Sequence, residues 1–264
     1  MIDPTIWPPP VVIAHRGSRQ LWPENTMHAF EQALVTGVEH IETDVHLSSD
    51  GVVHCLHDHT IDRTTDGNGL LSQYSATELE RFDAGFRHAP GAGYPFRGRG
   101  IRIPRFEDVV AALPEAKFVV ELKEDAVVEP LASLIGRMGI GRRVVVGSFS
   151  DARLARFREL TGPEVPISTG VAATRRWLAS SRVGRPGGTG ASALQVPLQM
   201  RGLQVVSPRL VSIAHAAGLQ VHVWTVNDPL VMSRLLVIGV DGLITDRPDV
   251  ALEVIESHSS PIRD

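Results

Sequence analysis

Short apolar runs alternate with stretches of helical periodicity along the whole 264-residue chain. Runs rich in β-branched and aromatic residues, bounded by turn residues, predict strands. Nine ranges fit this pattern: 11–15, 39–45, 52–57, 117–122, 143–148, 165–169, 203–206, 220–225 and 242–245. Apolar residues three and four positions apart predict helices after residue 25 and over 150–160, 208–217 and 228–238. Strands that alternate with helices are typical of a parallel α/β fold.

The number and order of these elements fit a TIM (β/α)8 barrel that forms one domain over residues 1–264. Barrels of roughly 250 residues are ordinary single domains. The first predicted helix has the residue types expected at a helix start and end, because Asn25 is expected to cap its start and Gly37 to follow its end. The sequence therefore predicts an α/β barrel.

The region of the second and third strands departs from the regular order. The turn 48–51 has the sequence Ser-Ser-Asp-Gly and is too short for a parallel crossover, which needs about a dozen residues or more. The ranges 39–47 and 52–57 should therefore pair as an antiparallel hairpin, which makes the barrel irregular here. Regular pairing would place Asp44 about level with His57.

Residues from about 59 to 105 fit no β/α repeat, and we expect them to form a small insertion. The final part, 85–105, contains no acidic residue and five arginines: Arg87, Arg97, Arg99, Arg102 and Arg105. Two interpretations are open for it, a solvated surface loop or a lid that bears on an anionic substrate.

Composition limits the class of protein. Hydrophobic residues make up 43% and charged residues 21% of the chain, as is typical of a globular domain. The net charge of −4 gives no support for nucleic acid or an anionic membrane as the main partner. The single cysteine, Cys55, cannot form an internal disulfide, and we expect it to be a core residue in a reducing compartment.

The sequence predicts no transmembrane segment, because no stretch approaches the roughly 20 apolar residues of a spanning helix. Residues 1–10 are proline-rich and uncharged except for Asp3, and the first predicted strand follows directly. They lack the basic segment and apolar core of a signal peptide. We therefore expect a cytoplasmic protein.

Carboxylates in predicted strands provide the candidate chemistry. Glu42 and Asp44 are two positions apart and so point to one face, and Glu121 and Lys123 do the same on another strand. An exposed acidic pair on an edge strand is the alternative, but the apolar neighbours indicate burial, and buried charges must be paired or bind a metal. Three carboxylates suit one oxygen-binding divalent cation, Mg²⁺ or Ca²⁺, with Mn²⁺ as a further candidate.

Two histidines and two cations complete this set. His15 and His57 close apolar runs, and barrel active sites gather at the carboxyl ends of strands. Cleaving a phosphodiester needs one group to activate the nucleophile and another to protonate the leaving alkoxide, and two imidazoles that titrate near neutrality fit both tasks. Arg16 and Lys123 would neutralise the phosphoryl oxygens. The set predicts metal-assisted cleavage of a phosphodiester.

Two further residues carry weaker signals. Trp224 ends the penultimate predicted strand, and its side chain is expected either to line a substrate pocket or to pack in the core. Asp246 follows the last strand and is expected to cap a turn or the last helix rather than to act in catalysis.

Ten short motifs follow one another along nearly the whole chain: His15-Arg16-Gly17, Pro23-Glu24-Asn25-Thr26, Glu42-Thr43-Asp44-Val45, Asp50-Gly51, His57-Asp58, Arg63-Thr64-Thr65 with Gly67 and Gly69, Glu121-Leu122-Lys123, Ser148-Phe149, Trp224-Thr225-Val226-Asn227 and Asp241-Gly242-Leu243-Ile244-Thr245-Asp246. In this order and spacing they resemble the glycerophosphodiester phosphodiesterase family.

The resemblance implies a TIM-type barrel with a small insertion after the strand of His57. It assigns the divalent ion to Glu42, Asp44 and Glu121, acid–base catalysis to His15 and His57, and the phosphate to Arg16 and Lys123. The implied reaction converts a small glycerophosphodiester to sn-glycerol 3-phosphate and an alcohol. Attack by the glycerol's own hydroxyl through a cyclic phosphate and direct attack by water both remain open.

Two other functions are considered. A lysophospholipase D or a sphingolipid-type phospholipase on the same barrel would have to meet a lipid surface, for which Phe86, Tyr94 and Phe96 of the insertion are candidates. A catalytically silent barrel could bind phosphodiesters as a scaffold. The sequence indicates neither the leaving alcohol nor the oligomeric state.

Overall fold

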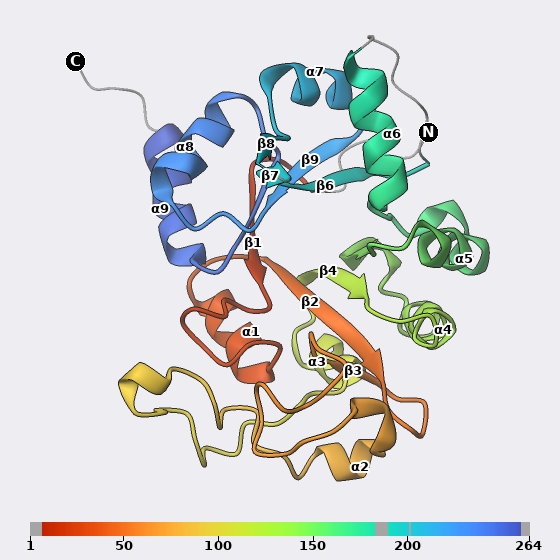
Figure 1. Ribbon diagram of the computed structural model, residues 1–264, viewed down its shortest axis with the longest axis vertical. Helices are drawn as coiled ribbons and strands as arrows, with labels where there is room; N and C mark the ends of the chain where they lie inside the picture. Colours follow the sequence, from red (N-terminus) through yellow and green to blue (C-terminus); the bar gives the residue numbers. More distant parts are fainter. Residues whose placement is uncertain (1–6, 183–189, 201, 260–264) are drawn as a thin grey trace.

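The computed structural model describes residues 7–182, 190–200 and 202–259 (Figure 1). Strands gather at the centre of the molecule, and helices lie around them. The described strands are β1 (Val11–His15), β2 (His40–Leu47), β3 (Val53–Cys55), β4 (Lys117–Leu122), β5 (Val144–Gly147), β6 (Ala193–Pro197), β7 (Gln199–Met200), β8 (Leu203–Gln204), β9 (Gln220–Trp224) and β10 (Gly242–Thr245).

Parallel strands form a curved sheet in the order β5-β4-β2-β1-β10-β9-β6. A short segment joins the two outer strands of this order, because Ile167 bridges Val146 of β5 and Ser168 bridges Ala193 of β6, both in parallel. That segment, predicted as the strand 165–169, takes the eighth position and completes the ring. The predicted TIM (β/α)8 barrel is therefore confirmed.

Helices cover the outside of the barrel (Figure 1). The described α-helices are α1 (Met27–Val35), α2 (Ala76–Leu79), α3 (Phe106–Ala112), α4 (Val128–Met138), α5 (Asp151–Thr161), α6 (Val171–Arg182), α7 (Pro208–Ala216), α8 (Pro229–Val237) and α9 (Pro248–Ser259). Short 3₁₀ helices are η1 (Leu71–Gln73), η2 (Pro90–Ala92), η3 (Gly141–Arg143) and η4 (Gly162–Glu164). The predicted helices α5, α7 and α8 lie within one residue of their expected bounds. Among the described helices, none is both long and apolar enough to cross a membrane.

Strand alternation decides which side chains face the inside of the barrel. In β1, Val11 and Ile13 join the inner cluster of apolar residues, whereas Val12 and Ala14 pack outward against the helices. His15 follows the inward pattern at the end of the strand. The same alternation turns the acidic residues of β2 and β4 inward, because the intervening apolar residues belong to the outer core.

The structure corrects the predicted strand 203–206. Its first two residues form β8, which pairs with β7 in a separate two-stranded sheet. The barrel strand of this region is β6, which is not among the predicted strands. Gln195 interrupts the apolar run of β6 because this position faces the cavity inside the barrel, and the interruption weakened the strand signal.

Thr26, and not Asn25, caps α1. The Thr26 hydroxyl accepts a hydrogen bond from the backbone N–H of Ala29 at 3.1 Å. Asn25 has a left-handed backbone (φ 55°), its Nδ2 donates to Asp44 Oδ2 at 2.9 Å, and its Oδ1 accepts from the Thr43 hydroxyl at 2.7 Å. Asn25 therefore orients a carboxylate instead of starting the helix. Beyond α1, the predicted glycine follows the helix end with a positive φ of 103°.

The predicted antiparallel hairpin is present, with Val45 of β2 opposite Cys55 of β3. The N–H of Leu56 donates to the carbonyl of Asp44 at 3.0 Å, so that His57 lies one residue beyond the level of Asp44. Cys55 is a core residue as expected, and burial raises the pKa of its thiol to about 12.

The segment 59–105 lies along one edge of the molecule (orange to yellow in Figure 1) and is stabilised by a small apolar cluster that it shares with the preceding Leu56. That cluster consists of Leu56, Ile61, Leu71, Leu79, Ala84 and Ile103. Arginines add to the packing, because the Arg97 guanidinium lies 3.9 Å from the ring centroids of both Phe86 and Tyr94. The segment therefore packs within itself beside the hairpin.

Candidate active site

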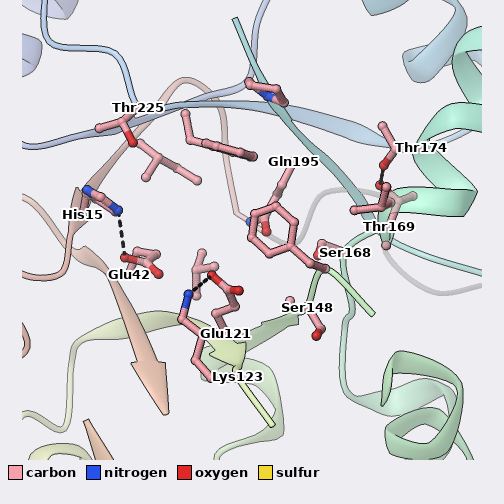
Figure 2. A pocket seen from close by; sticks show the side chains of 18 of the residues that line it. His15, Glu42, Glu121, Lys123, Ser148, Ser168, Thr169, Thr174, Gln195 and Thr225 are labelled. Atoms are coloured by element: carbon pink, nitrogen blue, oxygen red, sulfur yellow. Dashed lines mark hydrogen bonds and ion pairs between the residues drawn. The ribbon is translucent and has the colours of Figure 1, made fainter. Parts of the chain in front are cut away.

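A cavity of about 680 Å³ opens among the carboxyl ends of the barrel strands (Figure 2). Its walls come from segments far apart in the sequence, because all parallel strands end at the same edge. Seven predicted site residues line it: His15, Arg16, Glu42, His57, Glu121, Lys123 and Trp224. The eighth, Asp44, is 1% exposed and contacts two of them, Arg16 and Lys123.

Three carboxylates form the acidic centre of the cavity. Glu42, Asp44 and Glu121 each offer an oxygen atom, and these atoms lie within 4.8 Å of one another. Neighbouring strands β2 and β4 bring them together, since the parallel register sets Asp44 beside Glu121. The backbone N–H of Arg16, in a left-handed conformation with φ 53°, donates to Glu42 Oε2 at 3.0 Å.

Two cations are fixed at this centre. The Lys123 ammonium lies 2.9 Å from Asp44 Oδ1 and 2.9 Å from Glu121 Oε2. Arg16 Nε lies 3.3 Å from Asp44 Oδ2, and its Nη1 donates to Glu24 Oε1 at 2.9 Å. Burial opposes the charge of Asp44, but Lys123 and Arg16 outweigh burial and hold the pKa of Asp44 below its usual value.

The donor set fits a hard divalent cation. Burial, followed by the negative charge of Asp44, raises the pKa of Glu42 well above its usual range, and burial raises the pKa of Glu121 as well. Three carboxylates thus face the two cations Arg16 and Lys123, which leaves negative charge uncompensated when all three are ionised. A divalent cation would restore the balance, and oxygen ligands are those that Mg²⁺, Ca²⁺ and Mn²⁺ prefer.

His15 is held by Asp246, which follows the neighbouring strand β10. His15 Nδ1 lies 2.7 Å from Asp246 Oδ1, and Oδ2 of Asp246 accepts from Arg19 Nε at 3.2 Å and from Asn227 Nδ2 at 3.0 Å. Because a carboxylate only accepts, Nδ1 carries the proton and Nε2, 3.9 Å from Glu42 Oε2, is left for a ligand.

This contact corrects the expectation that Asp246 caps a turn or the last helix. The signal was available in the sequence, because Asp246 directly follows a barrel strand and barrel active sites gather at the carboxyl ends of strands.

His57 is held by a chain of ion pairs. Its Nδ1 lies 2.6 Å from Asp58 Oδ1, and Asp58 Oδ2 accepts from Arg63 Nε at 2.6 Å. Arg63 donates to both oxygens of Glu24 at 2.8 and 2.7 Å, and Glu24 also binds Arg16. Burial lowers the pKa of His57, although nearby carboxylates act in the opposite direction. This series of ion pairs connects His57 to Arg16. The side chains between them, Asp58, Arg63 and Glu24, belong to the sequence motifs but were not predicted as site residues.

The wall opposite His15 carries a group of uncharged polar side chains, labelled in Figure 2: Ser148, Ser168, Thr169, Thr174 and Gln195. Trp224 lines the cavity, and its ring meets the exposed ring of Phe149 edge to face, with centroids 5.8 Å apart. Of these hydroxyl residues, only Ser148 belongs to a sequence motif, because serine and threonine near strand ends are common in turns as well.

The arginines of 85–105 do not reach this site, since no residue of that range lines the cavity. Arg87 Nε donates to the carbonyl of Thr65 at 2.9 Å, and Arg97 Nε donates to that of Phe86 at 3.0 Å. These contacts favour the surface-loop interpretation over a lid.

The chain is similar to a known family over most of its length. Residues 15–250 match the model of the glycerophosphoryl diester phosphodiesterase family. A probable glycerophosphodiester phosphodiesterase 2 of Mycobacterium tuberculosis is 37% identical over 255 residues, which cover 93% of this chain and 90% of the relative. A glycerophosphodiester phosphodiesterase of Caldanaerobacter subterraneus is 30% identical over 258 residues, covering 93% and 97%.

Solved structures share the fold. A glycerophosphodiester phosphodiesterase from Agrobacterium tumefaciens has a TM-score of 0.76 and 29% identity, covering 92% of this chain and 99% of the other. An Oleispira antarctica phosphodiesterase in complex with the product sn-glycerol-3-phosphate has a TM-score of 0.75 and 26% identity, covering 94% and 97%. On the strength of the family match and these relatives, the chain belongs to the glycerophosphoryl diester phosphodiesterase family.

Proposed function

We propose that this protein hydrolyses small glycerophosphodiesters to sn-glycerol 3-phosphate and an alcohol, using a divalent cation and the pair His15 and His57. The observation that carries the proposal is the convergence of three carboxylates, two carboxylate-bound histidines and two cations on one cavity. Family membership supports it, and the related Oleispira antarctica phosphodiesterase was solved with the product sn-glycerol-3-phosphate.

The histidines would move the protons. In both imidazoles Nδ1 is committed to a carboxylate, so Nε2 is the atom that can exchange a proton with a substrate. One imidazole would accept the proton of the attacking hydroxyl or water, and the other would donate to the oxygen of the leaving alcohol. Such proton transfer typically contributes about 10²- to 10⁴-fold to the rate.

Positive groups in fixed positions would stabilise the negative charge of the phosphoryl group. A divalent cation held by Glu42, Asp44 and Glu121 would stabilise negative charge on the phosphoryl oxygens when bound. Arg16 and Lys123 would add to this effect without rearrangement, because ion pairs already hold them at the floor of the cavity.

The test is release of sn-glycerol 3-phosphate from a panel of glycerophosphodiesters, first with chelator and then with Mg²⁺, Ca²⁺ or Mn²⁺ added. We expect turnover to stop with chelator and to return with the metal. Glu42→Gln and His57→Ala should each reduce turnover by about 10²-fold or more while the fold stays intact. Glu39→Gln is the matched control, because Glu39 is exposed and pairs with Lys117 outside the cavity.

Full turnover of a folded Glu42→Gln variant, or turnover that chelator leaves unchanged, would contradict the proposal. A folded, metal-loaded protein without turnover on any substrate would favour the silent scaffold. Higher rates on lysolipid or sphingolipid vesicles than on soluble head groups would favour the phospholipase. Phe86, Tyr94 and Phe96 give that alternative no support at the site, since they do not line the cavity.

Three finer expectations are part of the proposal. A substrate analogue without the glycerol hydroxyl next to the phosphate would lose turnover if the cyclic phosphate is formed and keep it if water attacks directly. Limited proteolysis tests whether residues 1–264 form one domain. Cell fractionation tests the predicted cytoplasmic location.

A further inference from the structure

A second group of potential metal ligands lies outside the cavity. His46, His59 and Glu124 each offer one ligand atom, and the three atoms lie within 4.8 Å of one another. They come from β2, from the segment after β3 and from the segment after β4. None of the three lines the cavity. Two imidazoles and one carboxylate form a different donor set from the three carboxylates of the candidate active site.

The hydrogen bonds of His46 decide which of its nitrogen atoms is free. Its Nε2 lies 3.2 Å from the carbonyl oxygen of His57, and a carbonyl can only accept, so Nε2 carries the proton. In the neutral ring, Nδ1 therefore holds a lone pair. That atom is 3.4 Å from Glu124 Oε1, which is also an acceptor. Two acceptors that face each other need a proton or a cation between them.

The separation of one ligand pair fits a tetrahedral ion. Ligands about 2.1 Å from a tetrahedral zinc ion lie about 3.4 Å from one another, which matches the separation of His46 Nδ1 and Glu124 Oε1. Glu124 is held in place, because Oε1 also accepts the backbone N–H of Leu47 at 2.7 Å. The ring of His59 lies edge to face with that of His46, with centroids 4.9 Å apart, and its exposure leaves it room to turn toward the ion.

Metal-bound histidines in proteins almost always donate their second N–H to a carboxylate, carbonyl or water, and ligating carboxylates are themselves hydrogen-bonded. His46 and Glu124 each have such a partner. We propose that His46, His59 and Glu124 bind one zinc-type divalent ion, with solvent in the fourth position. Imidazole ligands suit Zn²⁺, whereas the carboxylate centre suits harder cations. Through His59, the ion would hold the segment after β3, which contains His57, close to β2 and to the end of β4.

The test measures Zn²⁺ binding to the full-length chain by equilibrium dialysis, with excess Mg²⁺ present to occupy the carboxylate centre. We expect one Zn²⁺ per chain and a rise in Tm on addition of Zn²⁺. His59→Ala and Glu124→Gln should each weaken binding by about 100-fold or more and abolish the rise in Tm. His258→Ala removes another exposed histidine, on α9, and should change neither quantity.

Glu121→Gln locates the bound ion, since it alters the cavity but not the proposed ligands and should leave Zn²⁺ binding unchanged. The proposal is overturned if wild-type protein binds no Zn²⁺ in excess Mg²⁺, in which case His46 and Glu124 form a plain ion pair. It is equally overturned if both His59→Ala and Glu124→Gln, folded by circular dichroism, bind Zn²⁺ like wild type. No substrate enters these measurements, so their outcome is independent of the proposed phosphodiesterase activity.

Discussion

At the scale of single residues, the two candidate acid–base histidines are held in the same way. Each has a carboxylate oxygen against Nδ1, at 2.7 Å for His15 and Asp246 and at 2.6 Å for His57 and Asp58. The carboxylates come from different places, one from the neighbouring strand end and one from the next residue in the chain. Both set the neutral tautomer in which Nδ1 carries the proton and Nε2 does not.

Asp246→Asn tests this positioning role. Arg19 and Asn227 both donate to Oδ2 of Asp246, so an asparagine would turn its oxygen toward them and its NH₂ group toward His15 Nδ1. That arrangement forces the other imidazole tautomer. We expect kcat to fall about 10²-fold with little change in KM, measured by release of sn-glycerol 3-phosphate across a range of pH.

Asp249→Asn is the control for this substitution, because Asp249 pairs with Arg247 outside the cavity. An unchanged kcat and pH profile for Asp246→Asn would show that Asp246 is not needed to orient His15.

At the scale of elements, the turn between β1 and α1 depends on a close approach at Gly17. Its φ is +74°, and a Cβ built there would lie 2.8 Å from Ala29 Cβ and 2.9 Å from the Ala29 carbonyl carbon. The helix therefore packs directly on the turn that carries His15 and Arg16. Only glycine combines this conformation with this space.

Gly17→Ala should lower the free energy of unfolding by about 2 kcal/mol or more, because strain at positive φ adds to a clash with the backbone of α1. Denaturant unfolding measures the effect. Gly51→Ala is matched in φ, at +82°, with no atom within 4 Å of the added Cβ, and should cost only about 1 kcal/mol. Equal costs at the two positions would refute the close-packing argument.

The insertion gives a second prediction at this scale. Arg97 stacks on Phe86 and Tyr94 and donates to the Phe86 carbonyl, so its role is packing within the insertion. Arg97→Ala should lower stability by about 0.5–1 kcal/mol and leave kcat and KM unchanged. Steady-state kinetics on a glycerophosphodiester decide the point, and a marked rise in KM would restore the lid interpretation. Arg175→Ala, at a residue that does line the cavity, is the comparison.

At the scale of the whole molecule, neutral histidines are buried in the barrel and in its β2–β3 hairpin. Burial lowers the pKa of His40, His54 and His222 to about 4. His40 and His222 lie beside the buried Trp7 ring, with centroid separations of 4.5 and 6.3 Å. Trp7 joins the inner cluster with Val11, near the start of β1 and away from the candidate active site.

Stability should therefore fall with acid. An unfolded histidine titrates near pH 6.5, so below that value the unfolded chain binds protons that the folded chain does not accept until about pH 4. Stability is full above about pH 6.5 and is lost progressively as the pH falls toward 4, by up to about 3 kcal/mol per histidine. Denaturant unfolding between pH 7 and 4 measures the slope.

His54→Leu should make this slope shallower, whereas His258→Leu, at an exposed position, should leave it unchanged. Equal slopes for wild type and His54→Leu would contradict the assignment of the acid sensitivity to buried histidines.

The amino-acid sequence by itself was enough to predict the barrel fold and most of the residues of the candidate site. Alternating strand and helix patterns sufficed for a barrel, and the inward period of two placed Glu42 and Asp44 on one face. The family resemblance rested on local motifs and was confirmed by the match over residues 15–250. These features are local, since periodicity and short motifs are properties of neighbouring residues.

Only the tertiary structure decided the long-range partners. Asp246 is 231 positions from His15 in the chain, and no local pattern joins them until β10 lies beside β1. The strand β6 was missed because its polar Gln195 faces a cavity that exists only once the ring closes. Asn25 looked like a helix cap because capping and carboxylate binding use the same side chain, and the folded backbone selects between them. Pairings across the barrel depend on closure of the whole ring, which no window of sequence contains.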